Sequence, residues 1–168
     1  MAQAIIDSAR GLIPMRSPLK SETAKFVVTN GTTVGIGTVV ALTSGQLTIP
    51  AANADGPVLG VCLEYVVGNG TKTAMVCIDP DMHYRVLGDA AYDAAEVGSY
   101  GDLEAVTVSA TTGHSTAYMD TSTIAGTVTV KLFLTIMGPY EVVTPETNYW
   151  VVVKINNLSL NNSLIAVA

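Results

Sequence analysis

Charged side chains are scarce in this sequence. They make up 13% of its 168 residues, against roughly 25% in an average soluble domain. Hydrophobic residues reach 49%, and the mean hydropathy is positive at +0.42. A surface with so little charge predicts burial against other subunits, because large exposed apolar patches usually mark interfaces. We therefore expect a homo-oligomer rather than a free monomer.

Long apolar runs and a targeting signal are also missing. Gly, Thr and Asn interrupt every candidate run before it reaches the roughly 18 residues of a membrane-spanning helix, so no membrane partner is expected. The first residues lack a basic start followed by an apolar core, which argues against a signal peptide and for a reducing cytoplasm. There Cys62 and Cys77 should remain thiols, buried as small hydrophobic side chains.

The usual catalytic and cofactor motifs are absent as well. The sequence has no P-loop, no Gly-x-Gly-x-x-Gly that opens a helix, no Gly-x-Ser-x-Gly and no Cys-x-x-Cys. We therefore predict no enzyme, no catalytic residues and no cofactor. Asp79, Asp81 and His83 alternate as they would on one face of a strand, a donor set that can hold a divalent metal. Three polar residues in alternation also describe a solvated strand face, and we assign no metal site.

Basic residues concentrate at the N-terminus. Four of the eight fall within the first 25 residues, together with two acidic residues, so this segment carries about +2 and the rest about −8. So acidic a body argues against nucleic-acid binding, which depends on attraction to phosphates. Pro14 and Pro18 predict an extended arm over residues 1–23 that grips a partner, with a frayed terminus as the alternative. The candidate gripping residues are Ile5, Ile6, Arg10, Leu12, Ile13, Met15, Arg16 and Lys20.

Residues 24–168 read as a single all-β domain organised around residues 33–79. The turns Ser44-Gly45 and Asn69-Gly70, each flanked by apolar and β-branched residues, predict two hairpins. The second hairpin would join a long strand over residues 58–67 to the strand that follows, and it would place the two cysteines opposite each other or nearly so. Further strands are expected at residues 25–29, 82–87, 103–110, 114–118, 126–137 and 149–155. A turn at Thr112-Gly113 is expected between residues 103–110 and residues 114–118.

Two segments stand apart from these strands. Residues 79–104 form an acidic insertion that holds half of all the carboxylates. Within it Asp89 can cap a short helix, which Gly98 and Gly101 would end. The C-terminal extension, about residues 145–168, finishes in a segment that is rich in Asn, and it predicts a final strand that pairs with a neighbouring subunit.

The pattern of glycines and apolar residues over residues 37–64 and 70–78 resembles the capsid cement, or head-decoration, proteins of tailed bacteriophages. About a quarter of the chain carries this resemblance, and its motifs are turn glycines and apolar spacings rather than catalytic residues. The matching residues are Gly37, Val39, Val40, Leu42, Gly45, Leu47, Pro50, Ala51, Gly56, Val58, Leu59, Gly60, Val61, Leu63 and Glu64.

The resemblance implies a small β-barrel or β-tulip domain, usually trimeric, that binds the major capsid protein on the outer surface of the virion. It implies a role in stabilising the capsid near its three-fold or quasi-three-fold axes. The acidic insertion and the C-terminal extension depart from the family pattern. A tail or spike component that binds a host receptor is the alternative function. A trimeric β-barrel nucleotide hydrolase is a third class, and the sequence has no compact Asp-Tyr-Arg-Gly type motif to support it.

Overall fold

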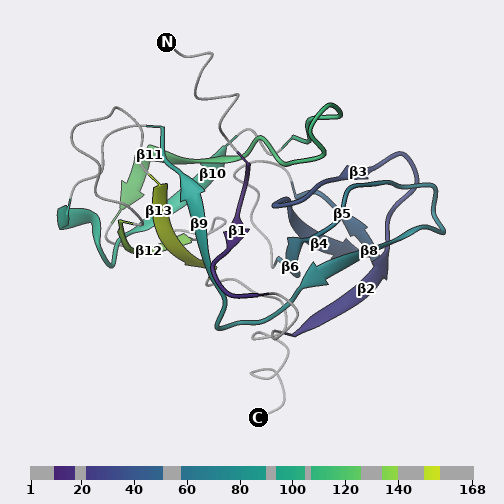
Figure 1. Ribbon diagram of the computed structural model, residues 1–168, viewed down its shortest axis with the longest axis horizontal. Helices are drawn as coiled ribbons and strands as arrows, with labels where there is room; N and C mark the ends of the chain where they lie inside the picture. Colours follow the sequence, from purple (N-terminus) through teal and green to yellow (C-terminus); the bar gives the residue numbers. More distant parts are fainter. Residues whose placement is uncertain are drawn as a thin grey trace.

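The computed structural model describes residues 10–17, 22–50, 58–89, 94–104, 107–125, 134–139 and 150–155. They form an all-β structure of mainly antiparallel strands (Figure 1), as the sequence predicts. A five-stranded sheet has the order β2 (Thr23–Val27), β8 (Thr73–Cys77), β6 (Gly60–Cys62), β4 (Val39–Thr43) and β5 (Gln46–Thr48). A six-stranded sheet has the order β1 (Ile13–Pro14), β9 (His83–Leu87), β13 (Trp150–Ile155), β12 (Leu134–Pro139), β10 (Tyr100–Glu104) and β11 (Tyr118–Ala125). The small sheet pairs β3 (Thr33–Val34) with β7 (Val66–Val67).

The predicted hairpin at Ser44-Gly45 is confirmed. Strands β4 and β5 pair with Leu42 opposite Leu47. Ser44 and Gly45 have φ values of 52° and 79°. Positive φ at both central residues is the geometry of a two-residue turn whose twist matches the strands that it joins.

The predicted long strand over residues 58–67 is wrong, because it divides into β6 and β7. β6 pairs with β8, whereas β7 leaves that sheet and pairs with β3. The break falls at Glu64, whose carboxylate accepts a hydrogen bond from the Met75 amide at 3.1 Å. That carboxylate takes the place of a backbone partner, so the chain can turn away from β8 while the Met75 amide stays paired.

Strand β6 and the parts of β4 and β8 beside it bury both of their faces. Val39, Val61 and Cys77 belong to a core cluster shared with the six-stranded sheet. The neighbouring residues Val40, Cys62 and Val76 point to the opposite face and belong to a second cluster. Double burial explains why the sequence is apolar at consecutive positions here instead of alternating.

The two cysteines therefore do not face each other. Cys62 pairs with Val76, and Cys77 pairs with Val61, in adjacent positions of the β6–β8 ladder. Successive side chains of a strand point to opposite faces, so the two thiols enter different core clusters. The sequence-based expectation that they lie opposite each other, or nearly so, holds for the backbone to within one ladder position, but this offset sends the two side chains to opposite faces.

The six-stranded sheet contains the C-terminal strands of the described chain. β13 alternates between half-buried and buried residues over its whole length. The predicted strand at residues 126–137 overlaps β12, in which Leu134 and Ile136 are buried as expected, while residues 126–133 and 156–168 lie outside the described residues. Each buried valine, leucine or isoleucine of these strands contributes about 1.5–3 kcal/mol.

The acidic segment differs from its prediction. Of the expected helix, residues 90–93 lie outside the described residues, and the described part holds the 3-10 helix η2 (Ala94–Glu96). Gly101 does not end a helix but lies within β10, where it pairs with Leu134. The Asp89 carboxylate accepts hydrogen bonds from the Thr121 amide and hydroxyl, at 2.9 and 2.6 Å. Long-range pairing with β11 and β12 thus decides the structure of this segment.

The turn at Thr112-Gly113 is present, but the strands predicted around it are displaced. Val108 and Ser115 form an isolated antiparallel bridge across the turn. The regular strands lie further out, at β10 and β11, and pair with Leu103 opposite Met119. The turn residues were predicted correctly because turn preference is local, whereas strand extent depends on the partner strands.

Candidate functional site

The candidate gripping segment is partly built into the body of the protein. Ile5, Ile6 and Lys20 lie outside the described residues. Arg10, Met15 and Arg16 are exposed, and Ile13 is half-buried in β1. Leu12, in contrast, is fully buried in the core cluster of the six-stranded sheet. The expectation that Leu12 contacts a partner is therefore wrong, because its side chain already fills the core of its own chain.

Residues 10–17 are held by backbone contacts as well as by Leu12. The Leu12 amide donates to the Gly37 carbonyl at 3.0 Å, and the Met15 amide donates to the His83 carbonyl at 2.9 Å. Between them, β1 pairs with β9 through Ile13 opposite Arg85. The expectation of an arm that runs free of the body does not hold for these eight residues, because a strand and a buried leucine tie them down.

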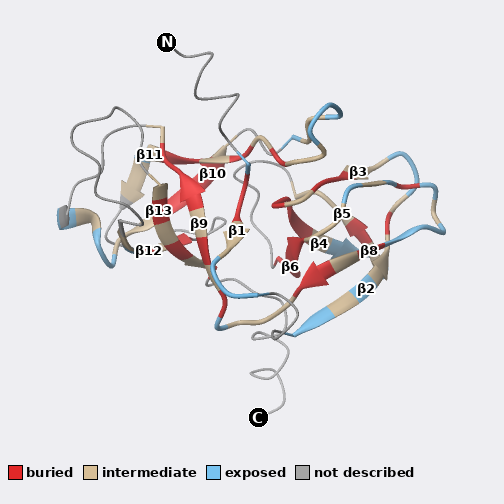
Figure 2. Ribbon diagram, in the orientation of Figure 1, coloured by how far each residue is buried: buried red, intermediate tan, exposed pale blue. Residues whose placement is uncertain are grey.

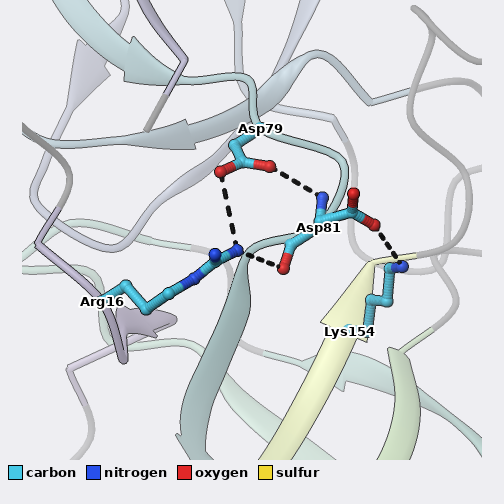
Figure 3. Close-up of polar contacts among 4 residues, drawn as sticks. All are labelled: Arg16, Asp79, Asp81 and Lys154. Atoms are coloured by element: carbon cyan, nitrogen blue, oxygen red, sulfur yellow. Dashed lines mark hydrogen bonds and ion pairs between the residues drawn. The ribbon is translucent and has the colours of Figure 1, made fainter. Parts of the chain in front are cut away.

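Four charged side chains connect this segment to the turn between β8 and β9 and to the end of β13 (Figure 3). Arg16 Nη2 donates to the Asp81 carbonyl at 2.6 Å and lies 3.7 Å from Asp79 Oδ2. Lys154 Nζ donates to Asp81 Oδ1 at 3.0 Å, and this hydrogen bond lowers the pKa of the Asp81 carboxyl. Because Asp81 is exposed, water and salt screen this pair. The network sets the position of the three segments more than it stabilises the fold.

The same contacts show how Asp79, Asp81 and His83 are arranged. The two aspartates lie in the turn and not on one strand face, because β8 ends at Cys77 and β9 begins at His83. Asp79 Oδ1 accepts the Asp81 amide at 2.8 Å, which folds the turn. Within the described ranges, no group of three or more His, Cys, Asp or Glu side chains is placed to hold a metal ion.

Neither described histidine is placed for nucleophilic catalysis. His114 follows the turn at Gly113, and its buried Nδ1 has no hydrogen-bond partner. Burial and, to a smaller extent, the charge of Arg10 lower the pKa of His114. In the part of the chain that the structure describes, no hydrogen bond joins either imidazole to a hydroxyl or a thiol, as an activated nucleophile needs.

Exposed apolar side chains mark a second candidate surface. Tyr65 and Val67 are 40% and 48% exposed, and they line an open hollow with Val66, Lys72 and Thr73. The hollow lies between β7 and the start of β8. Four more large apolar side chains, at Met15, Leu42, Val97 and Met137, are exposed elsewhere. The sequence predicts such surface from its low charge but does not tell which residues form it.

Cys62 offers a test of how firmly the core is closed. Burial raises the pKa of this thiol from 9.0 to about 11. At pH 8 the folded protein should therefore hold roughly 100-fold less thiolate at Cys62 than the unfolded chain, and a disulfide reagent should modify it correspondingly slowly. Because the folded pKa is the higher one, the stabilising contribution is complete below pH 9 and is lost as the pH rises through 11.

The measurement compares the modification rate at pH 8 in buffer and in denaturant, in a Cys77→Ala variant that leaves Cys62 as the single thiol. A rate in buffer within a few-fold of the unfolded rate would contradict the buried position of Cys62.

No family model matches the chain, and no curated protein matches it. Among the described residues, no helix is long and apolar enough to span a membrane.

Proposed function

We propose that this chain is a structural virion protein that binds the outer surface of a tailed-phage capsid as a cement or decoration subunit. The observation that carries the proposal is the position of the residues that resemble that family. They build β4, the Ser44-Gly45 turn, β5 and β6, which form the centre and one edge of the five-stranded sheet. The resemblance therefore covers a contiguous piece of the fold rather than scattered similarities. It is an argument by analogy for function, because one fold can host many functions.

Three glycines of the pattern support this reading, because Gly37, Gly45 and Gly60 occupy positions that side chains disfavour. Gly37 and Gly45 have φ values of 83° and 79°. A Cβ at Gly60 would collide with the carbonyl of Cys77 on the neighbouring strand. Only glycine fits such positions without strain. The pattern thus specifies a backbone shape, which is the property expected of a shell component without catalytic residues.

We further propose that each large sheet curls toward a barrel and that the protein assembles as a trimer. At one end, Val28 next to β2 bridges Leu47 of β5, the opposite edge strand of the five-stranded sheet. Gly88 next to β9 bridges Met119 of β11 in the other sheet. Contacts between distant strands of one sheet are the first step of barrel closure. The low charge and the exposed apolar side chains support burial between subunits.

The gripping surface is proposed to include Arg10, Met15 and Arg16, with Ile13 partly covered. Their charges can steer the approach to the major capsid protein, and Met15 can anchor on it. Ile5, Ile6 and Lys20 remain candidates by sequence. This is a non-enzymatic role on the outer capsid surface, after synthesis in the bacterial cytoplasm.

Labelling of intact virions tests the proposal. Gold-conjugated antibodies against the purified protein are expected to decorate the heads of the phage that encodes it. An Arg10→Ser, Met15→Ser, Arg16→Ser variant should rebind stripped heads at least 10-fold more weakly than the native protein. Val97→Ser, which changes an equally exposed apolar residue far from this segment in sequence, is the matched control. Label on tails would favour the receptor-binding alternative, and virions without label would overturn both.

A further inference from the structure

One edge of the five-stranded sheet is open. β2 pairs with β8 over five residues, from Thr23 opposite Cys77 to Val27 opposite Thr73. The Val28 amide donates to the Lys72 carbonyl, and the Glu22 carbonyl accepts from Ile78, so the even-numbered residues face β8. In an antiparallel ladder the backbone groups of the odd-numbered residues then point away from β8.

Those outward groups belong to Thr23, Lys25 and Val27. At Thr23 and Lys25, no backbone amide or carbonyl has a partner on the outer side among the described strands, whereas Val27 adjoins the bridge between Val28 and Leu47 of β5. Figure 2 shows β2 along the margin of the molecule, with exposed and intermediate residues and none buried. Two residues with unpaired donors and acceptors are a short template for one more strand.

The neighbouring edge strand does not close this gap. β5 approaches the C-terminal end of β2, where Val28 bridges Leu47 and the Thr29 amide donates to the Leu47 carbonyl at 3.1 Å. The two edges thus meet at one end of the sheet and separate toward Thr23. The open part of β2, from Thr23 to Phe26, is about 13 Å long, at roughly 3.3 Å per residue.

Lys25 limits what can pair there. Its side chain is exposed in the middle of the open edge. Two copies of β2 that paired antiparallel about their midpoints would place the two lysines opposite each other, and like charges in that position destabilise a sheet. The edge therefore favours an uncharged or acidic strand over a second copy of itself.

The C-terminal segment has the required chemistry. Residues 156–168 contain no charged side chain. Leu158 and Leu160 alternate with polar residues, as in a half-buried strand. Thirteen residues span up to about 43 Å when extended, which exceeds the length of the open edge more than two-fold.

We propose that the outer edge of β2 accepts residues 156–168 of a second copy as an additional strand. The donor segment follows β13 in one sheet, and the acceptor edge lies in the other sheet, so each chain carries both halves of the contact at different places. Contacts of this kind join subunits head to tail, and they close into a ring when the rotation between successive subunits allows it. The inference deepens the oligomeric part of the proposed function, because the uncharged, apolar composition calls for burial between copies.

Two variants separate donor from acceptor. The first ends after Ile155, so it lacks the donor residues 156–168 but keeps the open edge of β2. The second, Lys25→Pro, keeps the donor and blocks the edge, because proline removes an outward amide and no hydrogen bond to β8. Lys25→Thr is the matched control, since it keeps the amide and favours a strand.

Light scattering coupled to gel filtration is expected to show a multimer for the native protein and for Lys25→Thr. Each of the other two variants alone should run as a 17 kDa class monomer. Their equimolar mixture should form a dimer, because one junction can form between an intact donor and an open edge. Hydrogen exchange of residues 22–28 should slow at least 10-fold in that dimer relative to the truncated chain.

A truncated chain with the native mass, or a mixture that stays monomeric, would overturn the proposal. The native protein could instead be a monomer in which residues 22–28 exchange hydrogen more slowly than in the truncated chain. In that case residues 156–168 fold back on their own chain, and the proposed contact between copies is refuted. Should Lys25→Pro fail to fold, the exchange comparison between native and truncated protein still decides the matter. Capsid binding is scored separately, so that a failure of the decoration role is distinguishable from a failure of this contact.

Discussion

Replacing Gly37 with alanine is expected to destabilise the protein by about 4 kcal/mol or more. The φ of 83° at this residue costs an L-residue about 1–2 kcal/mol. In addition, the new Cβ would collide with the Arg10 carbonyl and lie 3.2 Å from the Leu12 amide nitrogen. Hydrogen bonds hold both backbone segments in place. The Leu12 amide donates to the Gly37 carbonyl at 3.0 Å, and the Gly37 amide donates to the Cys62 carbonyl at 2.9 Å.

Gly45→Ala is the matched control for this prediction. Gly45 has nearly the same φ, 79°, but nothing lies within 4 Å of its would-be Cβ. Its replacement should therefore cost only the backbone strain, about 1–2 kcal/mol. Urea unfolding followed by circular dichroism measures both variants. If both variants lost the same free energy of unfolding, the segment around Leu12 would not pack closely against Gly37.

Truncating Leu12 to alanine is the second large effect, expected at about 3 kcal/mol. The side chain is fully buried in the core cluster of the six-stranded sheet. Removal of a buried leucine loses its transfer free energy and leaves a cavity, which together cost about 2–5 kcal/mol. Met15→Ala, three residues further on but 42% exposed, should change the free energy of unfolding by no more than about 0.5 kcal/mol.

Denaturant unfolding of the two variants distinguishes a core residue from a gripping residue. If Leu12→Ala and Met15→Ala were both neutral for stability but both weakened capsid binding, residues 10–17 would detach in solution and act as a free arm. The expected result is the reverse for Leu12. A deletion that tests the N-terminal segment for capsid binding should accordingly end before Arg10. A longer deletion would remove Leu12 from the core and would change stability as well as binding.

The candidate surface shows where sequence reasoning stops. Low charge predicted exposed apolar area, and the basic residues near the N-terminus predicted a contact segment. Leu12 and Met15 are both apolar and close in sequence, yet one is buried and the other exposed. Apart from Lys25 within a predicted strand, the sequence did not indicate that β2 is an edge strand. Whether a strand lies at an edge depends on how all the other strands of the sheet pair.

The all-β class and the hairpin turn at Ser44-Gly45 were determined by the sequence alone, because turn residues and alternation are local properties that act within a few residues. Tertiary structure decided what depends on partners. It split residues 58–67 between two sheets, sent Cys62 and Cys77 to opposite faces, and made Gly101 part of a strand. These outcomes follow from pairing and burial over long sequence separations, where packing overrides local preference.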